Sequence, residues 1–209
     1  AGLHVDRGLF VYLADPGAGQ IVQYNIEGQI VQTFENATEL PQPVTVAVDD
    51  GRAEVFGGDG LSARVLVFNR AGTISRAIGA QTSGGVRFGS IASITLGTDQ
   101  LYVADRLDRK VYALSAAGKL RYEFGNEELT QPGAMTADDY NRVYVADNGD
   151  NTIKVYRGGR YETVVGTRDD QSGLGFAQIA DLWASDGILY VADSAAASIE
   201  IMRVRPLCP

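Results

Sequence analysis

The stretch LYVAD at residues 101–105 decides the fold of this chain, because close variants of it recur at nearly constant spacing. The variants end at Asp15, Asp59, Asp105, Asp147 and Asp193. Successive copies are therefore 44, 46, 42 and 46 residues apart. A supersecondary unit of that length that repeats along a chain indicates a propeller or another repeat array. The sequence thus predicts five copies of one structural unit.

Each copy contains segments with strand-like patterns, and the pattern changes along the copy. The second segment, as at residues 101–104 and 143–146, is apolar at successive positions, so both of its faces must be covered. The fourth segment alternates, as in LRYEF at residues 120–124, which is typical of a strand with one face in water. This change from buried to exposed favours radially packed four-stranded sheets over a sandwich.

The fold class predicted is all-β, a β-propeller of four-stranded antiparallel blades in one domain that spans residues 1–209. The blades are expected at about residues 1–40, 41–88, 89–130, 131–176 and 177–209, and the last one lacks a fourth strand. The five repeats could form a five-bladed ring or part of a six-bladed one. Three explanations of the missing strand remain open: residues upstream of Ala1 provide the closing strand, a five-bladed ring has one three-stranded blade, or an open array is completed by another molecule.

The repeat is clearest in GAMTADDYNRVYVADNGDNTIKVY at residues 133–156, which resembles the NHL-repeat β-propellers. The resemblance covers essentially the whole chain. It implies a propeller fold, but propellers of this kind serve as protein-binding, RNA-binding, ligand-binding and enzymatic scaffolds. Function therefore has to be inferred from sites.

Composition limits the partners that we expect. The formal net charge is −8, which disfavours a nucleic-acid partner because a phosphate backbone would be repelled. No apolar run approaches the roughly 18 residues of a membrane span. The single cysteine, Cys208, excludes an internal disulfide, and no signal-like segment precedes Ala1. Small propellers that resemble this one are often exported, so we expect an extracytoplasmic (periplasmic or secreted) protein.

Candidate catalytic and metal-ligating groups are scarce. His4 is the only histidine, which excludes zinc sites built from several His ligands, and no G-x-S-x-G elbow supports a serine nucleophile. The segment DNGDNT at residues 147–152 lacks the spacing and the distal Glu of a calcium loop, so we interpret it as a hairpin. The five recurring aspartates are expected to fix turns by accepting backbone hydrogen bonds. We expect no cofactor and no metal.

Enzymes that resemble this architecture include amidating lyases, metal-dependent lactonases and streptogramin lyases. In these similar enzymes, several His or carboxylate groups generally converge on the central channel. No positions of this sequence can be matched to those catalytic residues. A hydrolase or lyase with a small-molecule site at the channel mouth is the alternative function. The favoured hypothesis is a non-enzymatic module that binds or assembles with a protein partner.

The loops between blades and those between second and third strands are expected to open on one face, where propellers commonly bind ligands. The candidate partner-binding residues on this face are Arg87, Phe88, Arg106, Arg109, Lys110, Glu127, Glu128, Arg168, Asp169 and Asp170. Phe88, Phe176 and Trp183 could anchor a partner or instead point into the core. The outer strands are a second candidate surface.

Overall fold

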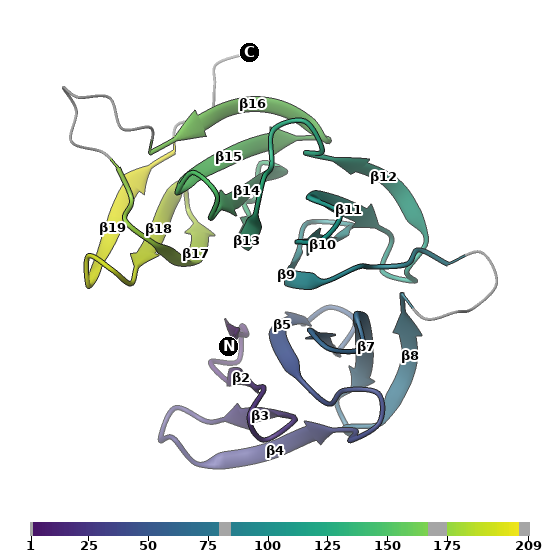
Figure 1. The fold of residues 1–209 in the computed structure, drawn as a ribbon. Coiled ribbons are helices and arrows are strands. Elements are labelled where there is room, and N and C mark those ends of the chain that lie inside the picture. Colours follow the sequence, from purple (N-terminus) through teal and green to yellow (C-terminus); the bar gives the residue numbers. More distant parts are fainter. Residues whose placement is uncertain (1, 80–84, 167–174, 205–209) are drawn as a thin grey trace.

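In the computed structural model, the chain forms five antiparallel sheets arranged radially around a central channel (Figure 1). The structure describes residues 2–79, 85–166 and 175–204. Every regular element in these residues is a strand, which confirms the all-β propeller of five blades. Within the same ranges there is no helix that is long and apolar enough to cross a membrane.

Four blades have four strands each, and in each the sheet order follows the chain. Blade one contains β1 (Leu3–Val5), β2 (Val11–Asp15), β3 (Gln20–Tyr24) and β4 (Ile30–Glu35). Blade two contains β5 (Pro43–Asp49), β6 (Glu54–Asp59), β7 (Arg64–Asn69) and β8 (Ile74–Ile78). Blade three contains β9 (Ile91–Leu96), β10 (Leu101–Asp105), β11 (Lys110–Leu114) and β12 (Leu120–Phe124). Blade four contains β13 (Pro132–Ala137), β14 (Arg142–Asp147), β15 (Thr152–Arg157) and β16 (Arg160–Val165).

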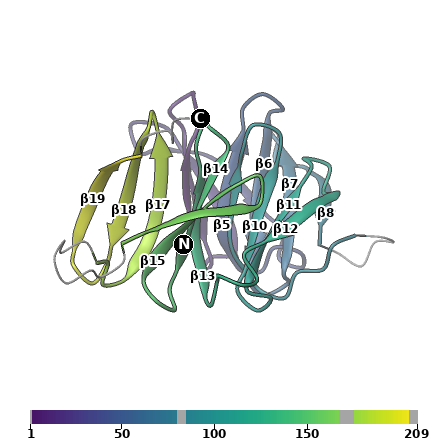
Figure 2. The same cartoon turned by 90° about the horizontal axis from the view of Figure 1, so that it is seen from above.

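Blade five has three strands, β17 (Ile179–Ser185), β18 (Ile188–Asp193) and β19 (Ser198–Arg203). They stand side by side at one end of the molecule (Figure 2). In the described part of the chain, β19 is the outermost strand of this blade and pairs only with β18. This matches the expectation of one three-stranded blade.

The core consists of four hydrophobic clusters, and each fills the junction between two successive blades. The cluster between blades three and four, for example, joins Tyr102 and Ala104 to Val143 and Val145. No such cluster joins blade five to blade one among the described residues. The ring is thus packed at four junctions, and its fifth side is open (Figure 1).

In blades two to five, the aspartate that ends the second strand ties the incoming inter-blade loop to the turn that follows the strand. The carboxylate of Asp105 accepts hydrogen bonds from the amides of Gly89 and Ser90 on the incoming loop, at 2.6 and 3.0 Å. It also accepts hydrogen bonds from the amides of Leu107 and Asp108 in the following turn, both at 3.0 Å. This confirms the structural interpretation, and it brings the inter-blade loop and the second hairpin to the same face.

Candidate functional site

The open side of the ring is bounded by one face of blade five. The strand register places Trp183, Tyr190 and Ile201 in one row of this face and Ala192 and Ile199 in the next. The residues of β18 that alternate with them, such as Leu189 and Val191, point the other way and pack against blade four. Blade five therefore has one covered face and one open face.

A comparison of residues at equivalent positions in the five blades shows how unusual the open face is. Ile199 pairs with Ala192, and the equivalent third-strand residues of the other four blades are each 0% exposed: Ile21, Val65, Val111 and Ile153. Ile199 itself is 67% exposed. Ile201 is 63% exposed, although its counterparts are buried: Gln23, Val67, Ala113 and Val155. Both isoleucines hold positions that a following blade covers elsewhere in the ring.

Blade one bounds the other side of the opening with a second exposed apolar face. Leu3 and Val5 on β1 are exposed, and Val11 and Leu13 on β2 are half-buried. Between the two blades lies a mainly apolar groove of about 390 Å³, whose walls include Leu3, Val5, Trp183, Tyr190 and Ile199. A contiguous exposed apolar patch of this kind commonly marks an interaction site.

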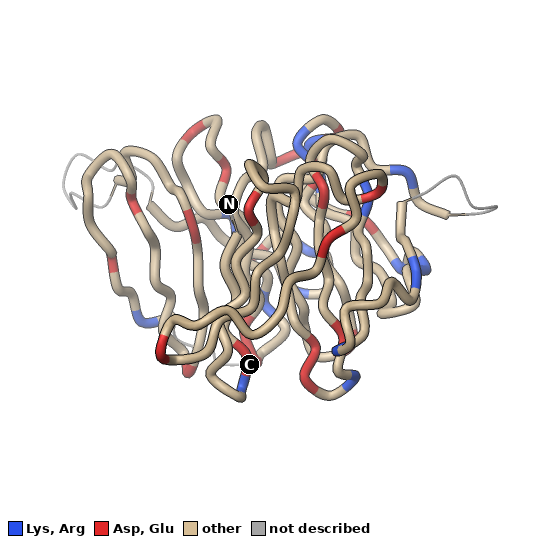
Figure 3. The backbone as a smooth tube through the Cα atoms, turned by 90° about the horizontal axis from the view of Figure 1, so that it is seen from below, with Lys and Arg blue, Asp and Glu red and all other residues tan. Residues whose placement is uncertain are grey.

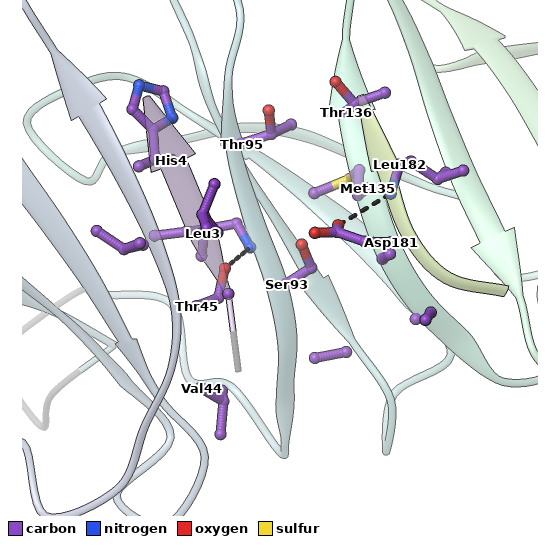
Figure 4. Close-up of a pocket in the computed structure, with 18 of the residues that line it drawn as sticks. Leu3, His4, Val44, Thr45, Ser93, Thr95, Met135, Thr136, Asp181 and Leu182 are labelled. Atoms are coloured by element: carbon purple, nitrogen blue, oxygen red, sulfur yellow. Dashed lines mark hydrogen bonds between the residues drawn. The ribbon is translucent and has the colours of Figure 1, made fainter. Parts of the chain in front are cut away.

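A central channel of about 310 Å³ lies beside this groove and is lined by the first strands of all five blades. Short polar side chains face it, among them Thr45, Ser93 and Thr136 (Figure 4). Two of these hydroxyls join neighbouring blades, because Thr45 Oγ1 accepts a hydrogen bond from the Ile94 amide and Thr136 Oγ1 accepts one from the Ala184 amide, both at 3.2 Å. The channel lining is therefore partly structural.

Two titratable residues, His4 and Asp181, line the channel. Burial lowers the pKa of His4 from its usual value of 6.5, although the nearby Asp50 and Asp6 carboxylates oppose this. Asp181 is exposed as a residue, but the channel wall partly removes its carboxylate from water and so raises its pKa. Its Oδ1 accepts a hydrogen bond from the Leu182 amide at 2.9 Å (Figure 4). The rings of His4 and Trp183 meet edge to face with centroids 6.1 Å apart. These residues lie where the channel meets the open side.

A wider opening of about 910 Å³ lies at the mouth formed by the hairpins between first and second strands. It is opposite the face that the sequence favoured. Two of its carboxylates form ion pairs within the protein: Asp49 pairs with Arg52 at 2.6 Å, and Asp138 pairs with Arg142 at 2.7 Å. These groups hold the hairpins together.

Those charged candidates from the sequence that the structure describes lie on the face of the inter-blade loops but do not form one site. Arg106 is exposed and lines the channel, whereas Lys110 pairs with Glu123 at 2.9 Å. Glu127 is exposed, and Glu128 accepts a hydrogen bond from the Tyr156 hydroxyl at 3.4 Å. Acidic and basic residues are interspersed along the chain (Figure 3).

Five further charged candidates remain. Arg87 and Arg109 are exposed. Arg168, Asp169 and Asp170 lie outside the described residues.

The three aromatic candidates behave differently from one another. Phe88 and Phe176 are buried, with 8% and 5% of their surface exposed, so Phe88 is not an accessible anchor. Phe88 instead packs against Tyr112, with ring centroids 5.3 Å apart. The interpretation that Trp183 points into the core is wrong, because this side chain is 47% exposed at the open side.

No group of three or more metal-ligating side chains occurs among the described His, Cys, Asp and Glu residues. In the segment at residues 147–152, the Lys154 ammonium lies between Asp147, at 3.8 Å, and Asp150, which it contacts directly. The side-chain cation of the protein thus occupies the space between these carboxylates. The hairpin interpretation of this segment is confirmed.

Sequence reasoning missed the open faces of blades one and five. The sequence did contain a signal, because the Tyr-x-Ala pair in the second strands of blades one, three and four recurs as Tyr190 and Ala192 in the last repeat. In blades one, three and four this pair packs against the following blade. Applying that rule to the fifth repeat would have identified an uncovered face.

Comparison with known proteins supports the fold and leaves the function open. No protein-family model matches the chain, and no curated protein matches it either. The NHL-repeat resemblance therefore stays a prediction.

Solved structures match the whole fold. A virginiamycin B lyase from Staphylococcus aureus superposes with a TM-score of 0.72 at 15% identity, over 98% of this chain and 69% of the lyase. A catalytically inactive histidine-to-alanine variant of virginiamycin B lyase from the same organism, with quinupristin, gives a TM-score of 0.73 at 16% identity, over 97% of this chain and 69% of the lyase. A streptogramin B lyase gives 0.72 at 14% identity, over 98% and 68%. At these identities the likeness shows a shared propeller fold.

Proposed function

We propose that this protein is a binding module that holds a protein partner through the apolar faces at the open side of its ring. The observation that supports this proposal is the exposure of Ile199, 67%, at a position that is fully buried in the other four blades. Water is a poor environment for a surface that is patterned for sheet packing, so covering it with a partner is favourable.

The groove offers both shape and anchoring groups to such a partner. Trp183 and Tyr190 lie in its wall beside Ile199, and large aromatic side chains dominate the binding energy of protein interfaces. The charged residues on the loop-bearing face are not grouped around this groove, so we assign them to the rim or to solvent. The interface is therefore apolar, with its centre on blade five.

The test compares two variants of matched chemistry. Ile199→Asp with Ile201→Asp places charges on the open face, whereas Leu61→Asp with Leu107→Asp places charges at sites that are also exposed, 71% and 70%, but lie in the turns of blades two and three, outside the groove. Immobilised wild-type protein and the Leu61/Leu107 variant should retain the same proteins from an extract of the source organism. The Ile199/Ile201 variant should lose them. Equal retention by all three proteins contradicts the proposal.

A second candidate function is suggested by the structural neighbours. They are lyases, and one was solved with quinupristin, so the channel mouth could hold a streptogramin-type compound beside His4 and Trp183. His4 would be the proton-transferring group, because it is the only histidine and burial keeps it neutral near pH 7. Incubation with quinupristin followed by mass spectrometry tests this function. Turnover by the wild-type protein that His4→Ala abolishes would favour it, and an unchanged compound would exclude it for this substrate.

A further inference from the structure

We infer that the partner at the open side is itself a β-sheet of propeller-blade type, about two repeats in size, that packs against blades five and one together. This inference rests on the proposed function and names the chemistry of the partner. The argument starts from the composition of the four packed junctions.

Each packed junction pairs two different kinds of face. One blade contributes the aromatic and small residues of its second strand, such as Tyr144 and Ala146, and the next contributes branched aliphatic residues, such as Leu189 and Val191. The same pairing recurs between Tyr102 with Ala104 and Val143 with Val145. Blade two follows it with smaller residues, because Phe56 and Gly58 face blade three while Val55 and Gly57 face blade one. The second strand of a blade is thus mainly aliphatic on the face toward the preceding blade and carries an aromatic and a small residue on the other.

Each of the two open faces is of one of these two kinds and lacks the partner face that it would meet at a packed junction. Blade five presents its aromatic and small pair, Tyr190 and Ala192, to the groove. Blade one has aliphatic residues at the complementary positions, Val11 and Leu13, and both are half-buried. An occupant that satisfies both faces needs an aliphatic surface on one side and an aromatic and small surface on the other. That is the description of a blade.

The size of the occupant follows from the lengths of the structural neighbours. The aligned region covers 98% of this chain of 209 residues but only 69% of the lyase chain. Roughly 90 lyase residues therefore lie outside the match, which is about two units of the repeat length seen here. The propeller geometry that these five blades follow thus has room for about two more.

A second copy of this chain is a poorer fit. It carries the same two faces, so a contact would join blade five of one copy to blade one of the next. Such a head-to-tail contact leaves one face open in each terminal molecule and propagates when the rotation does not close. A two-blade sheet covers both faces in one binding event.

The experiment extends the full chain with a second copy of residues 89–166, which carries blades three and four, through a flexible linker. In the correct arrangement, Leu101 and Val103 of the added copy meet Tyr190 and Ala192, while its Ala146 faces blade one. We expect amide hydrogen exchange in β18 and β19 to slow by about tenfold or more, because their open face becomes covered. Binding of a hydrophobic dye should fall in parallel.

Matched controls make the result specific. The same fusion with Ile199→Asp and Ile201→Asp should show no protection of β18 and β19, whereas the fusion with Leu61→Asp and Leu107→Asp in the original chain, both exposed and outside the groove, should behave as the unsubstituted one. Unchanged exchange in β18 and β19, or added blades that exchange as an unfolded chain, would overturn the inference. Concentration-dependent self-association of the unextended chain that Ile199→Asp abolishes would identify a second copy as the occupant and would also overturn it.

Failure of this inference can be told apart from failure of the proposed function. If native proteins are retained in a manner that depends on Ile199 and Ile201 but the added blades give no protection, the surface binds a partner of another kind. If retention does not depend on these residues, the proposed function itself fails.

Discussion

His4 and Trp183 meet edge to face, with ring centroids 6.1 Å apart, and so join the first strand of the first blade to the first strand of the last. At the four other junctions, neighbouring blades are joined by clusters of ten or more buried residues. Here an aromatic contact near the channel is flanked by an open apolar groove. The ring is therefore held at its inner edge while its outer strands on this side stay uncovered.

The first prediction concerns the energy of this contact. Edge-to-face aromatic pairs contribute about 0.5 to 1.5 kcal/mol beyond the area that they bury. A double-mutant cycle of His4→Ala and Trp183→Ala should give a coupling free energy near the lower end of this range, because Trp183 is 47% exposed. Urea unfolding of the four proteins measures it. A coupling free energy of zero would show that the two rings do not join the blades.

The second prediction concerns the protonation of His4. Burial lowers its pKa below 6.5, so between that folded-state pKa and pH 6.5 the unfolded chain binds more protons than the folded one. The free energy of unfolding should therefore fall as the pH falls below 6.5, and the fall should level off below the folded pKa.

Trp183 reports the same event, because it is the only tryptophan in the chain. Its fluorescence should change with a midpoint below pH 6.5 as the adjacent imidazole gains a proton. His4→Gln should remove this transition. A midpoint above 6.5 would contradict the burial of His4.

The third prediction concerns Asp181. Burial raises its pKa, so the folded state holds this proton more tightly than the unfolded state, and stability is lost as the pH rises from 3.8 through the folded pKa. Asp181→Asn should therefore raise the melting temperature at pH 7, by a small amount because water still reaches this residue, and have little effect near pH 3. Asp99→Asn, at an exposed position that does not line the channel, serves as the control and should change neither value. A melting temperature at pH 7 that falls in Asp181→Asn would refute this account.

The fourth prediction compares equivalent isoleucines in two blades. Ile153 is 0% exposed, and truncation of a buried isoleucine to alanine costs about 2 to 5 kcal/mol. Ile199 occupies the same repeat position but is 67% exposed, so Ile199→Ala should change the free energy of unfolding by only about 0.5 kcal/mol or less. Chemical denaturation of both variants checks this difference. Similar losses would mean that blade five is covered in the isolated protein.

The fifth prediction concerns the aspartate clamps. The carboxylate of Asp105 accepts hydrogen bonds from four backbone amides on two segments, whereas within the described residues the carboxylate of Asp15 accepts them only from the amides of Gly17 and Ala18. Hydrogen bonds to a charged group are worth about 1.5 to 3 kcal/mol each when a buried partner would be left unsatisfied. Asp105→Ala should cost about 3 kcal/mol or more, and Asp15→Ala clearly less. An equal cost, measured by denaturation, would mean that the inter-blade hydrogen bonds of Asp105 add no stability.

The repeat and its register could be predicted from the sequence because they depend on local patterns. The spacing of the five aspartates predicted five blades. Successive apolar residues, as at positions 143–146, predicted strands that are covered on both faces. The role of Asp105 was also predictable, because a carboxylate that precedes a turn has backbone amides within reach. These features repeat, so each copy supports the interpretation of the others.

Only the tertiary structure decided which copies of the same residue are covered. Ile153 and Ile199 have equivalent places in their repeats, yet one is buried and the other is open, because burial depends on whether another blade follows. The exposure of Trp183, the burial of Phe88 and the contact between His4 and Trp183 were settled in the same way. A repeated sequence determines the shape of each blade, whereas the number of neighbours around the axis determines which of its faces meets water.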